Sequence, residues 1–261
     1  MDQVGLRERA ARLENLAHHT WPCLEEARLG DWILRAAQGF TRRANSVLAV
    51  GACPGDDLDA TLGDIRTWYE DRSIEPCLKI TPLAPLGLDE HLDNTGWAKI
   101  TCTRVMGRNL QAVSGPVAGN SLQSSVVLDR HWLEAHARWE GETPIDTRSN
   151  EALLLRMDRP LFFSWVVGDA TLALVVASLR GDAAHLYSLV VDPRHRGRGI
   201  GRTFVAAVLS RLCELGMGEV VLQVLESNQV ARTLYASLGF SDLYGYHYRF
   251  ALRGESPTTG C

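Results

Sequence analysis

A single segment, residues 189–202, constrains the fold of this chain more than any other. It reads LVVDPRHRGRGIGR: the end of an apolar strand, an Asp-Pro turn, a loop of glycine and arginine, and the start of a helix. Glycine lets successive backbone N–H groups face one point, and a helix N-terminus adds partial positive charge. The segment is therefore suited to bind an anion such as a pyrophosphate, and it requires a strand that leads directly into a helix.

The residues on either side of this segment indicate a mixed α/β protein. Two apolar strands precede it and meet at Gly168-Asp169, a turn typical of an antiparallel hairpin. Such hairpins argue against a Rossmann unit, and the loop lacks the Gly-Lys-Ser/Thr of a Walker loop. The patterns predict strands at 161–167, 171–178 and 184–191, a helix at 200–215, a strand at 219–225, a helix at 229–238 and a strand at 243–252.

The N-terminal half has a similar order of elements. At an offset of about 143 residues, Gly96-Trp97 falls on Gly239-Phe240, and the order helix, strand, short helix, Gly-aromatic, strand occurs twice. This favours an internal repeat, with chance recurrence of helix–strand alternation as the alternative. The patterns predict helices at 4–18, 57–71 and 88–94 and strands at 31–37, 46–51, 77–81 and 97–106.

The repeat places the Gly/Arg loop on residues 53–58 of the N-terminal half, which read CPGDDL. Asp56 and Asp57 would repel a pyrophosphate there, and this stretch contains no arginine. We therefore expect one anion site per chain, in the C-terminal half.

Length and composition suggest one or two domains. With 261 residues, of which 46% are apolar and 22% charged, the chain is long enough to bury a core without disulfides. We predict a degenerate N-terminal domain at 1–115, a linker rich in Gly, Ser and Asn at 116–127, a second domain at 128–253 and a flexible tail at 254–261.

Several partners and compartments are disfavoured by the sequence. The net charge of −4 provides no excess of basic residues for nucleic acid. Residues 1–14 lack the apolar core of a secretory signal, and the apolar run 172–178 is far shorter than the roughly 20 residues that span a bilayer. The cysteines show no zinc-ligand spacing. We expect a cytoplasmic monomer or homodimer that uses no metal, nucleic acid or membrane.

Two motifs together resemble the GNAT (Gcn5-related N-acetyltransferase) superfamily. The first is Arg196-x-x-Gly199-x-Gly201 after a Val-Asp-Pro strand end, which is similar to that family's acetyl-CoA pyrophosphate loop. The second is residues 226–240, ESNQVARTLYASLGF, which is similar to its second cofactor motif. The resemblance implies an α+β fold: a central, mostly antiparallel, splayed sheet flanked by helices, here preceded by a smaller degenerate half.

A weaker resemblance extends over the rest of the chain. Trp21-Pro22, the stretch GFTRRANS at 39–46 and Tyr246-His247-Tyr248-Arg249 are similar to bacterial two-part GNAT proteins. Some of these are labelled N-acetylglutamate synthase-like or histone-acetyltransferase-like, and such labels are poor guides to substrate.

The resemblance implies a set of residues that bind acetyl-CoA. The pantetheine arm is expected to pair with the open backbone of residues 189–191, where the fourth and fifth strands of the fold splay apart. Asn228 either bonds to pantetheine or caps its helix, a role for which Ser227 competes. The cofactor-binding set is Leu189, Val190, Val191, Arg196, Gly197, Arg198, Gly199, Ile200, Gly201, Arg202, Asn228 and Tyr235.

The catalytic residues implied by the resemblance are Tyr235, His185 and Glu226. Tyr235 falls where many family members protonate the leaving thiolate, although it is equally suited to a core. Several members carry a general-base Glu four residues before the cofactor-binding triplet, where this chain has His185. Alternation predicts that His185, Tyr187 and Leu189 share a face. The alternatives to His185 as the general base are Glu226, water and the substrate itself. If His185 has no catalytic role, we expect it to be a surface residue at a hairpin end.

Five residues are expected near the acceptor amine. Arg42, Arg43 and Asn45 form a candidate carboxylate-binding fork, with a purely structural arginine pair as the alternative. Tyr246 and His247 lie on the last strand, which borders the acceptor pocket in this fold; a core stripe is the alternative.

The resemblance predicts an acetyl-CoA-dependent N-acetyltransferase that acts by direct transfer to the primary amine of a small molecule. An amino acid-like compound and an amine-bearing antibiotic are the acceptor classes considered. A protein lysine acetyltransferase and a non-catalytic acetyl-CoA-binding module are the alternatives.

Overall fold

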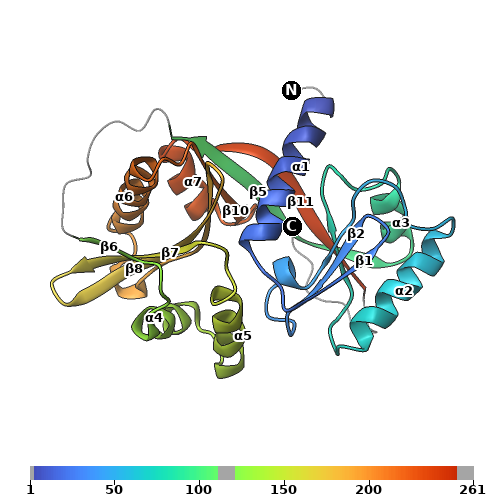
Figure 1. Ribbon diagram of the computed structural model, residues 1–261, viewed down its shortest axis with the longest axis horizontal. Helices are drawn as coiled ribbons and strands as arrows, with labels where there is room; N and C mark the ends of the chain where they lie inside the picture. The colour runs from blue at the N-terminus through green and yellow to red at the C-terminus, as the bar shows by residue number, and fades with distance from the viewer. Residues whose placement is uncertain (1–2, 111–120, 252–261) are drawn as a thin grey trace.

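The computed structural model describes residues 3–110 and 121–251, and its eleven strands form one sheet flanked by helices (Figure 1). The strands are β1 (Glu25–Leu29), β2 (Trp32–Ala36), β3 (Val47–Leu48), β4 (Cys77–Ile80), β5 (Trp97–Asn109), β6 (Leu122–Ser125), β7 (Pro160–Val167), β8 (Ala170–Arg180), β9 (Ala183–Val191), β10 (Glu219–Leu225) and β11 (Ser241–Ala251). The α-helices are α1 (Gln3–Thr20), α2 (Leu58–Glu70), α3 (Leu88–Asn94), α4 (Arg130–Glu140), α5 (Pro144–Leu154), α6 (Ile200–Glu214) and α7 (Gln229–Ser237). Two short 3₁₀ helices, η1 (Arg42–Ala44) and η2 (Pro193–His195), lie in loops.

The sheet has an internal symmetry centred on β5 and β11. Its order is β1-β2-β3-β4-β11-β5-β10-β9-β8-β7-β6. Outward from the centre, each side has an antiparallel junction, then a parallel pair (β4 with β3, β10 with β9), then antiparallel strands. The order β3, α2, β4, α3, β5 recurs as β9, α6, β10, α7, β11, as the internal repeat predicts.

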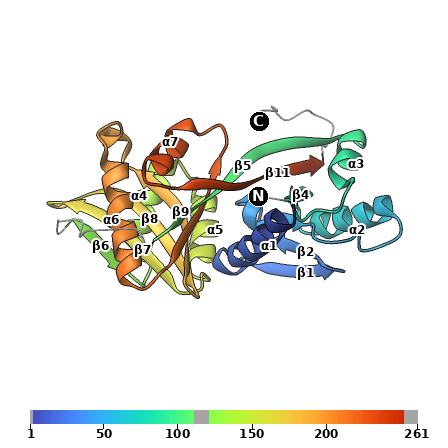
Figure 2. The same cartoon turned by 90° about the horizontal axis from the view of Figure 1, so that it is seen from above.

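The two halves of the chain exchange their last strands. β5, from the N-terminal half, pairs with β10, whereas β11, from the C-terminal half, pairs with β4. β5 and β11 also pair with each other, and both run from one half of the molecule to the other (Figure 2). Neither half therefore has a complete sheet of its own, and the domain boundaries proposed above stay a prediction.

β9 and β10 are parallel neighbours over only part of their length. Residues 183–186 of β9 pair with residues 219–222 of β10. Both strands continue beyond these pairs, to Val191 and Leu225. The described residues provide no strand partner on this side for 187–191, so that the strands part where the Gly/Arg loop begins.

A β-bulge in β9 changes which side chains share a face. Ser188 and Leu189 lie opposite a single residue of β8, and Ser188 has a positive φ of 57°. Beyond such a bulge the alternation reverses. Leu189 consequently packs on the α6 side of the sheet, whereas Tyr187 packs on the α4 side. The prediction that Leu189 shares a face with His185 and Tyr187 is wrong for this reason.

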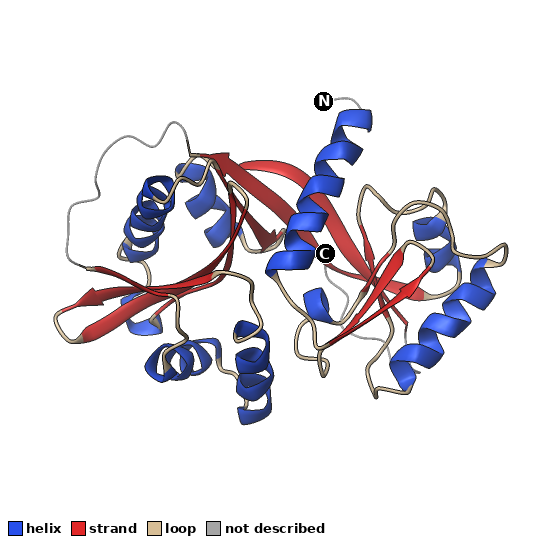
Figure 3. Ribbon diagram, viewed as in Figure 1, coloured by secondary structure: helices blue, strands red, loops and turns tan. Residues whose placement is uncertain are grey.

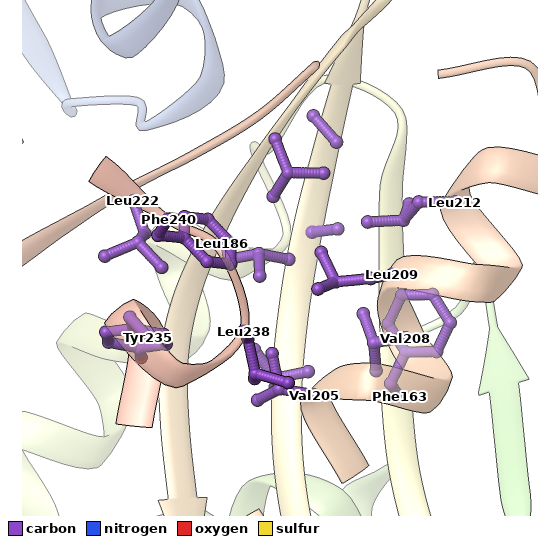
Figure 4. Packing of buried hydrophobic residues seen from close by; sticks show 14 of the residues in the cluster. Phe163, Leu186, Val205, Val208, Leu209, Leu212, Leu222, Tyr235, Leu238 and Phe240 are labelled. Atoms are coloured by element: carbon purple, nitrogen blue, oxygen red, sulfur yellow. The ribbon is translucent and has the colours of Figure 1, made fainter. Parts of the chain in front are cut away.

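Helices cover both faces of the C-terminal half of the sheet (Figure 3). The core between the sheet and helices α6 and α7 is shown in Figure 4 and includes Phe163, Leu186, Val208, Leu222 and Leu238. The opposite face packs on α4 and α5 through a second core. No helix in residues 3–110 or 121–251 is long and apolar enough to cross a bilayer.

Part of the predicted linker is a strand. Residues 122–125 form β6, which pairs antiparallel with residues 162–165 of β7 and so covers the outer edge of the sheet. A turn-rich composition does not reveal this pairing, because it depends on the open edge of β7. Residues 111–120 of the linker and the predicted tail at 254–261 lie outside the described residues.

α1 is anchored to the sheet by a buried ion pair within the N-terminal half, and a hydrogen bond from the C-terminal half reaches the same carboxylate. Lys79 Nζ, on β4, lies 2.6 and 2.8 Å from the two carboxylate oxygens of Glu14 on α1. The Tyr244 hydroxyl, on β11, donates to the same carboxylate at 2.8 Å. The exposed fractions of the Lys79 and Glu14 side chains are 8% and 4%. Removing one member would leave the other charged and buried.

We expect Lys79→Met to lower the free energy of unfolding by about 3–5 kcal/mol, as for other broken buried pairs. Denaturant unfolding measures the change. Glu14→Leu combined with Lys79→Met is expected to restore most of the loss. Arg130→Ala, which removes an exposed pair with Glu134 on α4, is the control and should leave the midpoint unchanged. A Lys79→Met midpoint equal to that of the control would contradict the prediction.

Candidate functional site

The Gly/Arg loop and the first turn of α6 present four exposed arginines. The loop begins at Asp192, a buried residue whose carboxylate accepts from the Arg194 backbone N–H at 2.9 Å and from its guanidinium at 2.7 Å. These hydrogen bonds hold the pKa of Asp192 well below its usual range. Arg194 is exposed but paired with Asp192, and Arg196, Arg198 and Arg202 also lie exposed around the loop.

Glycines shape the junction between this loop and α6. Gly197 and Gly199 have φ values of +75° and +76°, a region that L side chains rarely adopt. Gly199 is the N-cap of α6 and offers no capping side chain, so the first N–H groups of the helix are left for a ligand or water. A Cβ on Gly201 would lie 3.1 Å from Leu234 Cδ1 and 3.5 Å from Val191 Cγ2, so that glycine permits the close packing of α6 on α7 and β9.

The equivalent helix start in the N-terminal half is closed by its own side chain. Asp57 caps α2, and its Oδ1 accepts from the N–H groups of Asp59 and Ala60 at 2.9 and 3.2 Å. A carboxylate thus occupies the place that an anion would take. The capping supports the prediction that no pyrophosphate binds near Asp56 and Asp57. Besides repelling an anion, the Asp57 carboxylate occupies the N–H groups of Asp59 and Ala60 that an anion would need.

The second motif forms α7 and its start. Of the two roles predicted for Asn228, the structure has the cap: its side chain accepts from Ala231 N at 3.0 Å, and Ser227 does not take that role. Tyr235 lies in the core, with its ring 5.6 Å from that of Phe240 (Figure 4). Burial raises the pKa of the Tyr235 phenol above its ordinary value, so the group stays protonated at neutral pH.

His185 is a buried residue rather than a surface one. Its exposed fraction is 0%, and its ring stacks on that of Tyr187 with 4.2 Å between centroids. Burial, reinforced by the charges of Arg43 and Lys79, lowers the pKa of His185 well below its ordinary value. It does not line the cavity described below, so this placement does not favour the predicted role as general base.

Glu226, the alternative base, forms an ion pair. Arg104 Nη2 lies 2.6 Å from its Oε1, and this hydrogen bond lowers the pKa of Glu226. A carboxylate held in this way is a weaker base than a free one. Water or the substrate itself therefore stays the simplest acceptor for the proton.

A cavity of about 760 Å³ lies where the two halves meet, beside Leu225 at the end of β10. Four of the five predicted acceptor residues line it: Arg42, Arg43, Asn45 and Tyr246. Its other walls are Gly39, Phe40, Thr41, Ser73, Ile74, Glu75, Cys77, Thr101, Thr103, Tyr248 and Phe250.

The three residues predicted as a carboxylate fork differ in role. The Asn45 side chain is engaged by the backbone of its own loop: its Oδ1 accepts from Ala37 N at 2.6 Å and Gly39 N at 3.0 Å, and its Nδ2 donates to Thr41 O at 2.7 Å. Asn45 therefore holds the loop that carries the arginines. Arg42 is exposed, whereas Arg43 is partly buried.

Tyr246 and His247 lie on opposite faces of β11. The Tyr246 hydroxyl donates to Gln223 Oε1 at 2.7 Å, and the residue lines the cavity. His247 Nε2 lies 2.8 Å from Asp89 Oδ1 on α3 and does not line the cavity. The structure therefore does not bring His247 together with the other predicted acceptor residues.

Several cavity residues carry no signal that the sequence analysis could use. Thr101 and Thr103 lie on β5, which reaches the cavity only because of the strand exchange. Glu75 and Cys77 lie at the start of β4 and belong to no motif. Gly39, Phe40, Thr41 and Tyr248, in contrast, lie in the stretches 39–46 and 246–249 that carry the weaker resemblance.

Comparison with known proteins agrees with this geometry. The family described as "Probable histone acetyltransferase Rv0428c C-terminal" matches residues 9–250 of the chain. The uncharacterized N-acetyltransferase YobR of Bacillus subtilis (strain 168) is 27% identical over 247 residues, covering 91% of this chain and 97% of that protein. A mycothiol acetyltransferase of Salinispora arenicola (strain CNS-205) is 28% identical over 199 residues, covering 65% and 64%.

The fold has been solved in a distant relative. A GCN5-related N-acetyltransferase from Kribbella flavida matches 95% of this chain and 96% of its own with a TM-score of 0.67, at 14% sequence identity. This likeness confirms the predicted α+β fold with its large mixed sheet. The chain is therefore a GNAT-family acetyltransferase that belongs to the family described as "Probable histone acetyltransferase Rv0428c C-terminal".

Proposed function

We propose that this protein transfers an acetyl group from acetyl-CoA directly to the primary amine of a small molecule. The observation that carries the proposal is that the 760 Å³ cavity lies beside Leu225 at the end of β10, beyond the point where β10 stops pairing with β9. A cosubstrate in the gap and an acceptor in the cavity would lie close enough for direct transfer.

The residues at the Gly/Arg loop fit acetyl-CoA. The uncapped N–H groups of α6, together with Arg196, Arg198 and Arg202, would hold the pyrophosphate. The backbone of residues 189–191, which has no strand partner on the β10 side among the described residues, would pair with the pantetheine amides, although the Val191 carbonyl already accepts from Arg196 Nε at 3.1 Å. Tyr235, on α7, would hydrogen-bond to the coenzyme sulfur. The N-terminal half lacks this set because Asp57 closes α2.

We prefer a small molecule to a protein as the acceptor because both halves of the chain contribute to one cavity. Its lining comes from η1 and its loop, β4, β5, β10 and β11. A protein lysine acetyltransferase would need an open groove. A non-catalytic module stays the second alternative; the retained Arg196, Gly199, Gly201 and Tyr235 argue against it.

The proposed reaction is attack by a neutral amine on the thioester carbonyl carbon. A C–N bond forms and the C–S bond breaks, while the amine proton passes to water, the thiolate accepts a proton from Tyr235, and the Tyr235 phenolate then regains a proton from water. A phenol with a raised pKa is a weak acid, so donation requires a thiolate held close to it. Neither His185 nor Glu226 is placed as an evident general base.

Release of free thiol from acetyl-CoA tests the proposed activity. We expect release with a panel of small primary amines and much less with lysine-containing peptides. Release with peptides alone would favour the protein acetyltransferase. No release with any amine, together with tight acetyl-CoA binding, would favour the non-catalytic module.

Calorimetric titration with acetyl-CoA tests the cofactor site. We expect one site per chain, because Asp57 closes the equivalent helix start in the N-terminal half. Arg196→Glu should weaken binding at least about tenfold, since reversal of the charge replaces attraction with repulsion at the pyrophosphate. Arg211→Glu, at the far end of α6, is the control and should bind normally. Two equivalent sites, or unchanged affinity in Arg196→Glu, would contradict this assignment.

Tyr235→Phe tests the chemical step. The change removes one oxygen and keeps the ring, so acetyl-CoA affinity should stay within a few fold while turnover falls about ten- to thousandfold. Stopped-flow or single-turnover assays measure the step. Because transfer is direct, mass spectrometry of the enzyme with acetyl-CoA alone should show no competent acetyl-enzyme. Full turnover in Tyr235→Phe when chemistry limits the rate, or such an adduct, would overturn the assignment.

A further inference from the structure

Arg43 is a cation in the cavity wall that lacks an acidic partner. Among residues 3–110 and 121–251, no Asp or Glu forms an ion pair with its guanidinium, although Glu14 pairs with Lys79 and Glu226 with Arg104 nearby. The groups that interact with Arg43 are the phenols of Tyr187, Tyr246 and Tyr248, which are neutral at physiological pH, and the Tyr246 hydroxyl is close enough to accept a hydrogen bond from its guanidinium.

The position of Arg43 is held from two sides. Its carbonyl accepts from Arg35 Nη1 at 2.9 Å, and Asn45 holds the surrounding loop. Its guanidinium lies 5.9 Å from the centroid of the Trp21 ring and 5.8 Å from that of Tyr187. Trp21 and Tyr187 are themselves buried. Little side-chain freedom is therefore left to lose when a ligand binds.

Such a guanidinium is suited to a ligand with one negative charge. A partly desolvated cation without a counterion is unfavourable unless a ligand supplies one. The planar fork of arginine matches the two oxygens of a carboxylate. A phosphate dianion would call for a second partly buried cation in the wall of the large cavity, where the other arginine, Arg42, is exposed.

Arg43 also lies between the large cavity and the part of β9 where we propose that acetyl-CoA binds. It lines both the large cavity and a small one of about 20 Å³ beneath α1. Its ring neighbour Tyr187 directly precedes the bulge in β9, and its charge acts on the phenol of Tyr235. A molecule anchored at Arg43 would therefore extend between the cavity and the gap between β9 and β10.

We propose that the acceptor carries a carboxylate as well as its primary amine, and that Arg43 binds this carboxylate through two N–H donors. This inference rests on the proposed acetyl transfer and narrows its acceptor to amino acid-like compounds. Arg42 and Asn45 are not ligands in this arrangement: the first is exposed, and the second positions the loop.

Paired acceptors test the inference. The assay measures thiol release with glycine, L-alanine, L-leucine and 4-aminobutyrate, each beside its amide. We expect the acid to exceed the amide at least about tenfold in kcat/KM for the best pair. Arg43→Met should reduce that ratio to about threefold or less, chiefly by raising KM for the acid, and Arg43→Lys should retain part of the preference. Because each ratio is compared between variants, differences in amine pKa cancel.

Arg42→Met is the matched control from the same turn and should keep the wild-type ratio. An unchanged ratio in Arg43→Met would overturn the inference, and so would equal losses for acid and amide, which indicate a role in chemistry or folding. Absence of thiol release with every amine would contradict the proposed function instead.

A binding measurement does not depend on turnover. The Arg43 Nε–H resonance, assigned by its loss in Arg43→Lys, should shift when the preferred amino acid is added and not when its amide is added. Equal shifts, or none with the acid, would overturn the inference even if acetyl transfer occurs.

Discussion

The exchange of β5 and β11 between the halves is the constraint on which the rest of the structure depends. β5 and β11 pair with each other, and each also pairs with a strand of the opposite half. The four central strands, β4, β11, β5 and β10, therefore come alternately from the N-terminal and the C-terminal half. α1 reinforces this junction, because Glu14 contacts Lys79 on β4 and Tyr244 on β11. The cavity lies at the same junction. Its walls therefore form only when both halves are folded together.

The repeated halves differ at the start of a corresponding helix, and this difference bears on the proposed cofactor site. α2 and α6 begin at corresponding places, but the first is capped by Asp57 and the second by Gly199. A carboxylate side chain satisfies the N–H groups of α2, whereas glycine leaves those of α6 open. The N-terminal half has thus lost the features of a cofactor site. It supplies η1 and its loop to the cavity instead, which places Arg43 against Tyr187 of the other half.

The sequence was sufficient for features that depend on local chemistry. Gly199 and Gly201 identify the loop because few other residues allow its backbone and its packing, and the element order follows from apolar periodicity. Long-range pairing has no such signature: nothing in residues 97–109 indicates that they pair with β10. The bulge was missed because it lies at Ser188, not at a glycine. The alternative that His185 is a surface residue is wrong: a polar residue near a turn is ordinarily exposed, whereas His185 is buried.

Burial of polar groups at the junction explains why the acceptor site can be specific. Tyr246 is held by Gln223 and Asn45 by its loop, whereas the buried Tyr248 hydroxyl in the same cavity wall has no hydrogen-bond partner among the described residues. A ligand gains little by competing for groups that are satisfied, and it gains most from those that are not. The guanidinium of Arg43 has aromatic rings beside it and forms no ion pair with an acid in the described residues, which is why we propose it as the anchor of the acceptor. Selectivity then follows from whether an acceptor brings an anion to that point, since an uncharged acceptor would cover the guanidinium without compensating its charge.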